Sequence, residues 1–475
     1  MNVNSNNHPF ADWLRHLPTG WATSRLGNVA EIIFSNVDKH TVEGEVPVRL
    51  CNYVDVYKNE RITSEIPFME ASADAREIMR FQIRRGDVLA TKDSETPNDI
   101  AISALVAEDL PGVLCGYHLA LIRPCRHRLL GPYAAWLHAC KTFRAQYEAQ
   151  AVGVTRFGLS QAAFKEARVP LPLLPEQERI ASYLDASCAT TDAAVAAKRR
   201  QLETLDEIHT ATIQRAVTRG LTEKPRLKAT DSVWMKEIPE GWQLLALKRI
   251  SEIQTGLTLG KTYDGPLIER PYLRVANVQD GHLDLNDITT IEVPLDVAKR
   301  VELRPGDVLM TEGGDLDKLG RGYIWDGQIA DCLHQNHIFA VRCFPHKLLQ
   351  KFLAYLTASQ YGRDYFEATG KRTTNLASTN STKVGAFPIL LPPLDEQARI
   401  VEFLDDRTRQ HRDIQANIDA QIATLTAYRK SLIHECVTGQ YRVTEADVRR
   451  VEAQKAAATS WTPRHEETSA NEASQ

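Results

Sequence analysis

The stretch LPLLPEQERIASYLD, residues 171–185, returns almost unchanged as LLPPLDEQARIVEFLD, residues 390–405. Both copies contain a Glu-Gln pair, an Arg-Ile pair and a final Leu-Asp, and the offset is 220 residues, as between Glu176 and Glu396. Solenoid repeats have periods of about 20–50 residues. An offset this large instead indicates that the chain consists of two equivalent halves.

The duplication covers most of the chain. The other repeated stretches are LPTGW (17–21) and IPEGW (238–242), RRGDVLAT (84–91) and RPGDVLMT (304–311), and GYHLALIR (116–123) and QNHIFAVR (335–342). In each half, short apolar runs broken by Gly and Pro come first, which predicts strands joined by turns. A long segment without Pro or Gly comes last. The sequence therefore predicts an α+β protein with two strand-rich heads, each followed by a long helix.

The repeated stretch marks the start of each long helix. Pro175 suits a first helical turn, where its missing N–H is not needed, and Glu176 and Glu396 place negative charge at the positive end of the helix dipole. Neither Pro nor Gly follows until Gly220 and Gly439, so each helix spans about 43 residues, or about 65 Å. Such length without a break predicts a coiled coil.

A narrow apolar stripe runs along each helix. Its predicted members are Ile180, Leu184, Thr191, Val195, Leu202 and Leu205 in the first helix, and Ile414, Ile418, Ile422, Leu425 and Leu432 in the second, with Thr191 and His411 as polar interruptions. Two such helices in one chain most simply pair with each other, in antiparallel fashion, which would hold the heads at opposite ends of a rod. The alternative is that each helix packs on its own domain.

Composition limits the class of protein. The chain has 475 residues, of which 43% are hydrophobic and 25% charged, and a formal net charge of −4, which neither requires nor excludes nucleic acid. No apolar run approaches the roughly 20 residues that span a bilayer, and no secretory signal is visible. The eight cysteines are scattered without C-x-x-C spacing, which favours reduced thiols and a cytoplasmic protein.

The common catalytic motifs are missing. GLTLGKT (256–262) has only three residues between its glycines, too few for a phosphate-binding loop, and no G-x-G-x-x-G opens a helix. The N-P-P-F and D-P-P-Y boxes of amino-methyltransferases, the E-x-K of nucleases and H-E-x-x-H do not occur. We therefore expect a non-catalytic protein without a metal site that directs other subunits.

The order of these motifs resembles the DNA-specificity subunit of type I restriction–modification systems. The resemblance covers roughly residues 17–441 and rests on the P-x-G-W starts, the GDVL strands and the EQ-x-R-I helix openings, each present twice. It implies that each head is a target recognition domain that reads one half of a split site in double-stranded DNA, and that the helices set the spacing. It also implies two methyltransferase subunits as partners and, through them, restriction (translocase) subunits that defend against foreign DNA.

The resemblance assigns a role to each segment. We expect an N-terminal extension (1–16), a first target recognition domain (17–173), a first long helix (174–220), a second target recognition domain (221–393), a second long helix (394–440) and a partly disordered tail (441–475). It implies adenine-N6 methylation by the partners, so S-adenosylmethionine, ATP and Mg belong to the partner subunits and no cofactor belongs to this chain.

Two corresponding loops, 151–160 and 369–379, are the predicted DNA contacts. Arg and Lys bind guanine or phosphate, Asn binds adenine, and Thr binds phosphate or thymine. The turns after the GDVL strands, 91–95 and 311–315, are a second candidate, in which Lys92 could reach phosphate although the second copy is acidic. The candidates are Lys92 in the first of these turns, Gly153, Thr155 and Arg156 in the first loop, and Gly370, Lys371, Arg372, Thr373, Thr374 and Asn375 in the second loop. Ordinary solvated loops are the alternative. The matched His118 and His337 are expected to be hydrogen-bonded on buried strands. Candidate partner-docking residues are Glu176, Gln177, Arg179, Glu396, Gln397 and Arg399.

Two other functions fit the same pattern. One is a duplicated protein-interaction scaffold that binds no specific DNA, and the other is an enzyme with an unrecognised site. Salt-dependent binding of duplex DNA separates the first from a DNA reader, because phosphate contacts weaken steeply as salt rises. Activity of the isolated chain would support the second.

Overall fold

The computed structural model describes residues 9–279, 282–314, 319–320, 322–372 and 377–460. The chain forms two compact units: unit 1 contains residues 1–198 and 420–475, and unit 2 contains residues 199–419. Each unit therefore combines one strand-rich head with half of each long helix.

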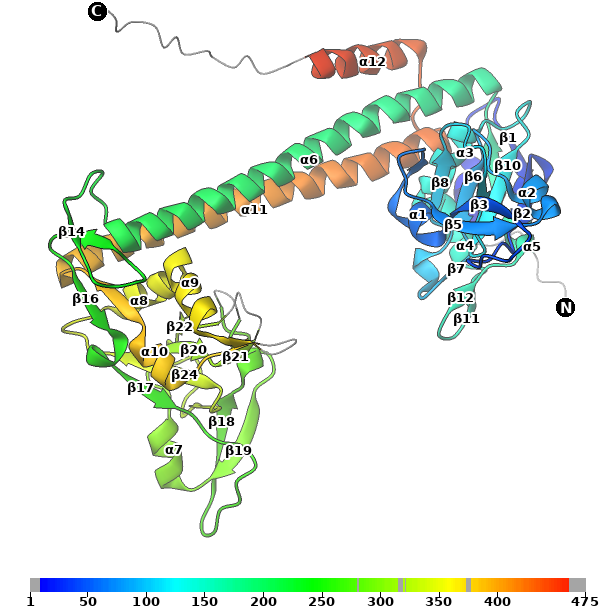
Figure 1. The fold of residues 1–475 in the computed structure, drawn as a ribbon. Helices are drawn as coiled ribbons and strands as arrows, with labels where there is room; N and C mark the ends of the chain where they lie inside the picture. The colour runs from blue at the N-terminus through cyan, green and yellow to red at the C-terminus, as the bar shows by residue number, and fades with distance from the viewer. Residues whose placement is uncertain (1–8, 280–281, 315–318, 321, 373–376, 461–475) are drawn as a thin grey trace, which may run out of the picture. The chain divides into compact units, whose positions relative to one another are not determined.

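Head one is built on a five-stranded sheet in the order β2-β10-β6-β8-β4, with smaller sheets β5-β3-β9, β11-β12-β7 and β1-β13 (Figure 1). Its elements are β1 (Ala22–Arg25), β2 (Ala30–Phe34), β3 (Val46–Cys51), α1 (Tyr53–Lys58), β4 (Arg61–Ile62), β5 (Met69–Ala73), α2 (Ala75–Phe81), β6 (Val88–Thr91), β7 (Asp93–Ser94), β8 (Ser103–Val106), β9 (Val113–Cys115), β10 (Leu119–Pro124), α3 (Gly131–Ala139), α4 (Lys141–Glu148), β11 (Val152–Gly153), β12 (Phe157–Gly158), α5 (Gln161–Glu166) and β13 (Arg168–Leu171).

The central sheet of head one separates two apolar cores. Side chains of successive strand residues point to opposite faces. Accordingly, Val88 and Ala90 of β6 join a core formed with α3, α4 and α5, whereas Leu89 joins a core formed with the β5-β3-β9 sheet. A strand buried on both faces explains why the GDVL runs are continuously apolar.

Head two repeats this topology. Sheet β17-β24-β20-β22 corresponds to the central sheet, β19-β18-β23 to β5-β3-β9, β21-β26-β25 to the small sheet, and β16-β27 to β1-β13. The elements are β14 (Leu227–Ala229), β15 (Glu237–Pro239), β16 (Gln243–Ala246), β17 (Ser251–Thr255), β18 (Ile268–Leu273), β19 (Thr289–Val293), α7 (Leu295–Val301), β20 (Val308–Thr311), β21 (Gly313–Gly314), β22 (Gly322–Ile324), β23 (Leu333–His334), β24 (Ile338–Cys343), α8 (Gln350–Ala358), α9 (Gln360–Thr369), β25 (Lys371–Arg372), β26 (Ala377–Ser378), α10 (Ser381–Ala386) and β27 (Pro388–Leu391).

The repeated Gly-Asp of the GDVL motif has a physical cause. Gly86 and Gly306 adopt φ of +92° and +93°, a conformation that favours glycine. The following Asp87 is buried and accepts two hydrogen bonds from Arg123, at 3.0 and 2.8 Å. Asp307 and Arg342 form the same bidentate pair in head two, at 2.8 and 2.7 Å. The turn before the central strand is thus fixed identically in both heads.

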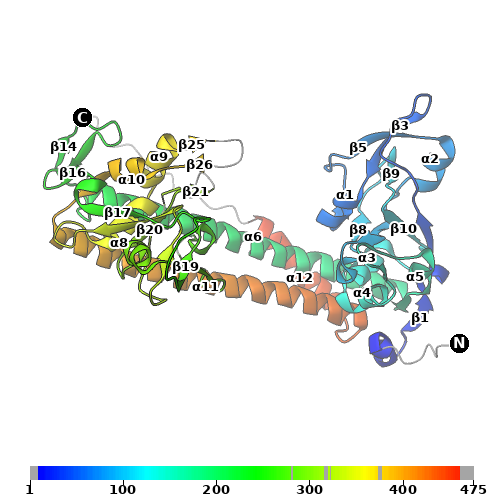
Figure 2. The same ribbon diagram turned by 90° about the horizontal axis from the view of Figure 1, so that it is seen from below.

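The two long helices pair in antiparallel fashion, as predicted. They are α6 (Leu174–Arg219) and α11 (Leu394–Thr438). In unit 1, Arg429 near the end of α11 contacts Asp192 near the start of α6 at 3.0 Å. In unit 2, the His209 ring near the end of α6 stacks on the His411 ring of α11, with centroids 4.2 Å apart. Figures 1 and 2 both show the helices side by side.

The apolar stripe predicted for α11 is wrong at one position. The seam, which is the row of α11 residues buried in the paired helices, does not include Ile414. Ile414 is 45% exposed, whereas Ile418 is 3% exposed. The residues that are at least half-buried recur with alternating spacings of four and three: Leu404, Thr408, His411, Gln415, Ile418, Ile422, Leu425, Arg429 and Leu432. Gln415 therefore occupies the seam beside the exposed Ile414. The prediction failed because some seam residues are polar, and hydrophobicity alone favours Ile414 over Gln415 at this turn of the helix.

A further helix, α12 (Glu445–Ser460), follows α11 and belongs to unit 1. Val443 before it and Val451 within it are buried in the same core as α3 and the start of α6. From Val448 onwards the sequence predicts a helical remnant followed by a disordered tail, and residues 461–475 lie outside the described residues. Within the described part of the chain, no helix is sufficiently long and apolar to cross a bilayer.

Substitution of Ile418 by Ala should destabilise unit 2 by about 2–4 kcal/mol, because it leaves a cavity in the paired helices. The matched substitution of the exposed Ile414 by Ala should cost less than about 0.5 kcal/mol. Urea unfolding of the full chain, followed by tryptophan fluorescence, measures both. Equal losses at the two positions would contradict the observed seam.

Candidate nucleic-acid interface

The structure joins the two separate sequence candidates of each head in one small sheet. In head one, β7 follows the GDVL strand and pairs with the β11–β12 hairpin, with Ser94 opposite Phe157. In head two, β21 pairs with β26 of the corresponding hairpin, with Gly313 opposite Ser378. The turn that contains Lys92 and the loop that contains Arg156 are therefore one site.

A network of charged side chains holds the hairpin of head one. Asp93, which is largely buried, contacts the Arg156 guanidinium at 2.5 Å and Nδ1 of His118 at 2.7 Å. Arg156 is still 57% exposed, and its hydrogen bond to Asp93 raises the pKa of the guanidinium further. Asp93 thus orients a permanently charged, fork-shaped donor at the surface of head one.

Lys92 is directed into the head. Its ammonium lies over the rings of Phe34 and Tyr117, at 5.1 and 4.6 Å from their centroids, and donates to the carbonyl of Ser35 at 3.3 Å. Burial lowers the pKa of Lys92, while the nearby Asp93 opposes that shift. Lys92 therefore packs against residues of head one in this structure, and its contact with DNA stays a prediction.

The tip of the hairpin is exposed and apolar. Val152 and Val154 are 79% and 92% exposed, and Thr155 is exposed beside them. A Cβ on Gly153 would lie 2.0 Å from the carbonyl oxygen of Arg156, so only glycine fits this tight turn. The tip of the hairpin, residues 152–156, is exposed to solvent, as a contact loop requires, whereas Phe157 packs against the core.

Aromatic side chains accompany the basic ones in head one. Tyr53 and Tyr57 of α1 stack with centroids 5.6 Å apart, and the Tyr57 hydroxyl donates to Asp99 at 2.8 Å. Both Tyr57 and Tyr117 are about half exposed. Neither these tyrosines nor Asp93 were predicted as individual site residues from the sequence, because residues from α1, β7 and the turn before β10 meet only after folding.

Head two carries a simpler version of the network. Nδ1 of His337 lies 2.5 Å from a carboxylate oxygen of Glu312. Glu312 stands at the position of Lys92, and glycine (Gly313) replaces Asp93. The matched histidines are hydrogen-bonded as expected, but the expected burial is wrong: His118 is half-buried, and half of the His337 side chain is exposed.

The remaining candidates of head two lie on its hairpin. Gly370 ends α9 through a hydrogen bond from its N–H to the carbonyl of Phe366, and Lys371 is exposed on β25. Arg372 pairs through its backbone with Ala377 of β26. The side chain of Arg372 and all of Thr373, Thr374 and Asn375 lie outside the described residues.

The two repeated glutamines among the docking candidates are internal. Gln177 is fully buried: its amide oxygen accepts from the N–H of Leu130, and its nitrogen donates to the carbonyls of Arg128 and Pro172, all at 2.9 Å. Gln397 makes the same three bonds, at the same length, to Leu349, Lys347 and Pro392. Both side chains join a long helix to its own head and are not accessible to a partner in this structure.

The other docking candidates differ between the units. Glu176 is buried and forms an ion pair with Arg442 at 2.9 Å, and Arg179 is half-buried. In unit 2, Glu396 is half-buried, and the exposed Arg399 contacts Asp395 at 3.6 Å. Docking by these residues stays a prediction, but the corresponding residues differ in burial between unit 1 and unit 2.

Head one also contains a cleft rich in arginine at the opposite end of β6 from the hairpin. The cleft has a volume of about 660 Å³, and its arginines are Arg61, Arg84, Arg85, Arg123 and Arg126. Pro305 and Pro345 stand in head two where Arg85 and Arg126 stand in head one. Two of the five arginines are therefore specific to head one, whereas Arg84 and Arg123 recur as Arg304 and Arg342.

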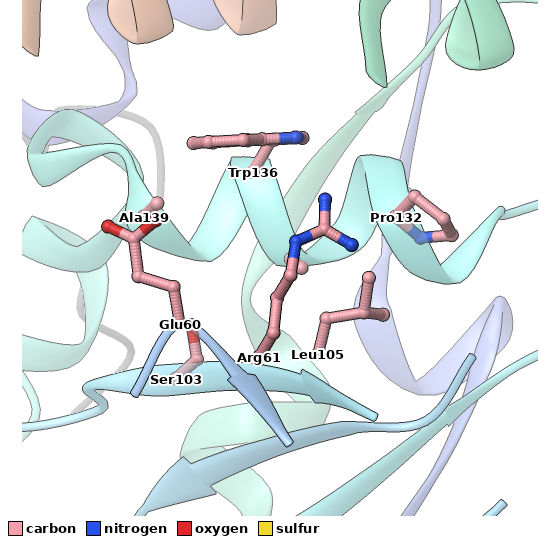
Figure 3. Close-up of a pocket in the computed structure, with 8 residues that line it drawn as sticks. Glu60, Arg61, Ser103, Leu105, Pro132, Trp136 and Ala139 are labelled. Atoms are coloured by element: carbon pink, nitrogen blue, oxygen red, sulfur yellow. The ribbon is translucent and has the colours of Figure 1, made fainter. Parts of the chain in front are cut away.

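A small cavity adjoins that cleft between β4, β8 and α3 (Figure 3). Its volume of about 40 Å³ holds little more than a water molecule. Around it, Arg61 contacts Asp185 of α6 at 2.6 Å, and the Trp136 indole N–H donates to the same carboxylate. Arg429 of α11 lies over the Trp136 ring and pairs with Glu60. The cavity thus belongs to the polar junction between head one and the helices.

Comparison with known proteins identifies the architecture. The family described as "Type I restriction modification DNA specificity domain" matches residues 18–204 and again residues 239–424, together more than half of the chain. The chain belongs to this specificity family. The two matches correspond to the two halves that the repeated sequence and the repeated topology define.

Relatives span both halves of this family member. The specificity subunit of the EcoKI type I restriction enzyme from Escherichia coli K12 is 26% identical over 352 residues, which cover 71% of each chain. The StySPI specificity subunit from Salmonella potsdam is 23% identical over 449 residues, which cover 91% of this chain and 92% of that subunit.

Solved structures share the fold. A chain from a type I restriction–modification system, described for its complex assembly and conformational transition, aligns with a TM-score of 0.68 at 20% identity and covers 90% of this chain and 99% of its own. The HsdS subunit from Thermoanaerobacter tengcongensis aligns with a TM-score of 0.53 at 20% identity and covers 90% and 98%. Among the described residues of the present specificity-family chain, no group of three or more His, Cys, Asp or Glu is placed to hold a metal ion.

Substitution of Gln177 by Leu should destabilise this specificity-family chain by about 2–5 kcal/mol, because it leaves one buried N–H and two buried carbonyls without partners. The control is the substitution of Gln410 by Leu, at an exposed position of α11, which should cost less than about 1 kcal/mol. Urea unfolding measures both. A mild effect of the Gln177 substitution would show that the glutamine is not an anchor.

Substitution of Asp93 by Asn should loosen the β11–β12 hairpin, because it removes the charge that pairs with Arg156 and His118. Amide hydrogen exchange in residues 152–158 should accelerate by roughly 5- to 10-fold, about 1 kcal/mol of lost protection, while the core of head one keeps its exchange rates. The control is the substitution of the exposed Asp38 by Asn. Unchanged exchange in the hairpin would refute the positioning role of Asp93.

Proposed function

We propose that this chain is a non-catalytic subunit that recognises a bipartite site in double-stranded DNA and directs partner subunits to it. The observation that carries the proposal is the duplicated head, in which an exposed hairpin with a basic side chain lies beside a histidine–carboxylate pair. Membership of the specificity family gives the general role, recognition of a DNA sequence. The bipartite site and the recruitment of partners are the specific parts of this proposal.

The chemistry of the hairpin in head one suits direct readout. A guanidinium held by a carboxylate loses little conformational entropy when it binds, and its fork matches either a phosphate or the O6 and N7 atoms of guanine. Tyr117 packs edge-on against His118, which contacts Arg156, and adds exposed aromatic surface there; Tyr57 of α1, which stacks on Tyr53, is also exposed. Basic and aromatic side chains on one surface are typical of nucleic-acid contacts.

The differences between the heads support two different half-sites. Head one presents Arg156 with Asp93 and His118, whereas head two presents Lys371 on β25 of the same small sheet and a Glu312–His337 pair before β21. Lysine is a point charge and arginine a planar fork, so the two surfaces favour different arrangements of acceptors. A reader with two unlike heads recognises two unlike sequences, separated by base pairs that it does not read.

The proposed partners carry the chemistry. Two methyltransferase subunits would bind S-adenosylmethionine and methylate adenine N6, and restriction subunits would use ATP and Mg for translocation and cleavage. The duplication supports two copies of the methyltransferase subunit, because a chain with two equivalent halves offers each partner surface twice.

Substitution of Arg156 by Ala should reduce affinity for the cognate duplex by about 5- to 150-fold, or 1–3 kcal/mol, and relax specificity in one half-site only, if the guanidinium reads a base. If it contacts phosphate, binding should weaken on all sequences and the salt slope should fall by about one. The control is Arg25, half exposed and paired with Glu166, substituted by Ala. Fluorescence anisotropy of the assembled methyltransferase complex at several salt concentrations measures these effects; unchanged affinity would exclude the hairpin as a contact.

The decisive experiment for the function as a whole is a genome-wide map of methylated adenines with and without this chain. We expect one split motif to lose methylation when the chain is deleted. Exchange of residues 17–165 for the head of a relative should then change one half of the motif and preserve the other. Methylation that does not depend on the chain would refute the proposal.

A further inference from the structure

Unit 2 contains an open groove where the two long helices meet near the end of α6. Its volume is about 350 Å³, and its lining residues are Ile208, Thr212, Arg215, Ala216, Gly220, Leu221, Phe403 and Arg407. Ile208 and Leu221 are both substantially exposed, although they are large and apolar. On α11 the groove is lined by Phe403 and Arg407, which come shortly after Glu396 and Arg399 of the repeated EQ-x-R-I motif.

The equivalent groove of unit 1 is largely filled. The offset of 220 residues that relates the helices places Tyr183 at the position of Phe403, Leu432 at that of Thr212, and Cys436 at that of Ala216. All three of these unit 1 residues are buried in one apolar core. The part of the groove next to these three residues is therefore filled in unit 1, whereas Tyr428, the counterpart of Ile208, remains 53% exposed.

The filling is supplied by the chain itself, through the segment that leads into α12. The Tyr441 ring stacks on the Tyr183 ring, with centroids 5.8 Å apart. Val443 and Val451 are buried in the core that contains Tyr183, and Val448 packs against it. Burial raises the pKa of Cys436 to about 12, with smaller contributions from Glu435 of α11, Cys188 of α6 and Asp447 of α12, which agrees with a segment that packs over the thiol.

The same segment also covers the repeated motif of unit 1. Arg442 forms an ion pair with Glu176 at 2.9 Å, and the Glu176 side chain is only 8% exposed. In unit 2 the chain runs from Gly220 and Leu221 towards β14 and head two, and it forms no helix at the corresponding position. The difference between the units thus follows from what comes after each long helix.

The open groove has a chemical preference. Arg215 and Arg407 stand at its rim, and neither forms an ion pair with any residue that the structure describes. Arg215 donates to the carbonyl of Glu223 at 3.3 Å, and Arg407 donates to the amide oxygen of Gln410 at 2.9 Å. An apolar helix face with acidic neighbours suits this groove. The segment through α12 covers unit 1 by apolar contacts and the Arg442–Glu176 ion pair, because Glu435 and Ser187 stand there at the positions of Arg215 and Arg407.

We propose that α12 is an internal occupant of one of two equivalent partner-docking grooves. The open groove of unit 2 receives an amphipathic helix of the methyltransferase partner directly. The groove of unit 1 receives a second copy only after α12 has left, so the two partner sites differ in affinity although the helices are repeated. This inference rests on the proposed function, because that function supplies the partner.

The test uses the full chain with Val448 and Val451 both substituted by Asp, which places charge on the packed face of α12. The control substitutes Ala446 and Ala453 by Asp, which adds the same charge at exposed positions of the same helix. Native mass spectrometry and titration calorimetry measure binding of the methyltransferase subunit of the same system. The maleimide labelling rate of Cys436, located by peptide mass spectrometry, reports the opening of α12 without any partner.

In the unsubstituted chain we expect the second methyltransferase copy to bind at least about tenfold more weakly than the first, within the usual range of coupling between sites. The V448D/V451D chain should bind both copies with similar affinity and label Cys436 at least about tenfold faster, and the A446D/A453D chain should behave like the unsubstituted one. If the V448D/V451D chain loses its cooperative unfolding, a chain that ends at Gln440 replaces it in both measurements.

Two results would overturn the inference: equal affinities for the two copies in the unsubstituted chain, or a second affinity that does not change when Cys436 becomes accessible. Failure of the proposed function looks different. In that case no variant binds the methyltransferase subunit at all, while the labelling rate of Cys436 still reports whether α12 covers the groove.

Discussion

The structure depends on one buried glutamine in each half. A long helix that began freely after a strand would be connected to its head only by the chain itself. Gln177 and Gln397 prevent this, because each side chain uses its oxygen and both hydrogens on backbone groups of the head and of the turn before the helix. A buried amide that satisfies every donor and acceptor fixes one orientation, since any other arrangement leaves polar groups without partners. The start of each helix is therefore rigidly attached to the head that precedes it.

The two halves share the residues that fix the backbone and differ in many of their surface residues. The residues that both halves keep are those that fix the backbone: the glutamines, the glycine with positive φ before the central strand, and the buried aspartate with its arginine. The residues that differ lie on the hairpins, on the rims of the grooves and in the seam. In the seam, His209 of unit 2 corresponds to Arg429 of unit 1, and His411 of unit 2 corresponds to Thr191 of unit 1. This separation is expected for a protein that keeps one fold and changes what it recognises.

Much of the fold was predictable because it depends on local rules. The absence of Pro and Gly, the proline in the first turn and the acidic N-termini located α6 and α11, and the repeat itself predicted two heads of one topology. The site was only partly predictable. The hairpin loops and the GDVL turns were recognised separately, and nothing local indicated that Asp93 would hold Arg156. The seam was misplaced at Ile414, because residues three or four positions from Ile418 satisfy the helical period equally well.

The sequence by itself determined the duplication, the α+β class, the two long helices and the family, since these follow from repeated motifs and from periodicity along the chain. Only the tertiary structure decided which repeated residues face inwards, which loops combine into a site, and that α12 fills the groove of one unit while the other stays open. The physical reason is that these properties depend on contacts between residues far apart in the chain, such as Arg442 with Glu176. A motif that occurs twice carries no information about which copy another segment will cover.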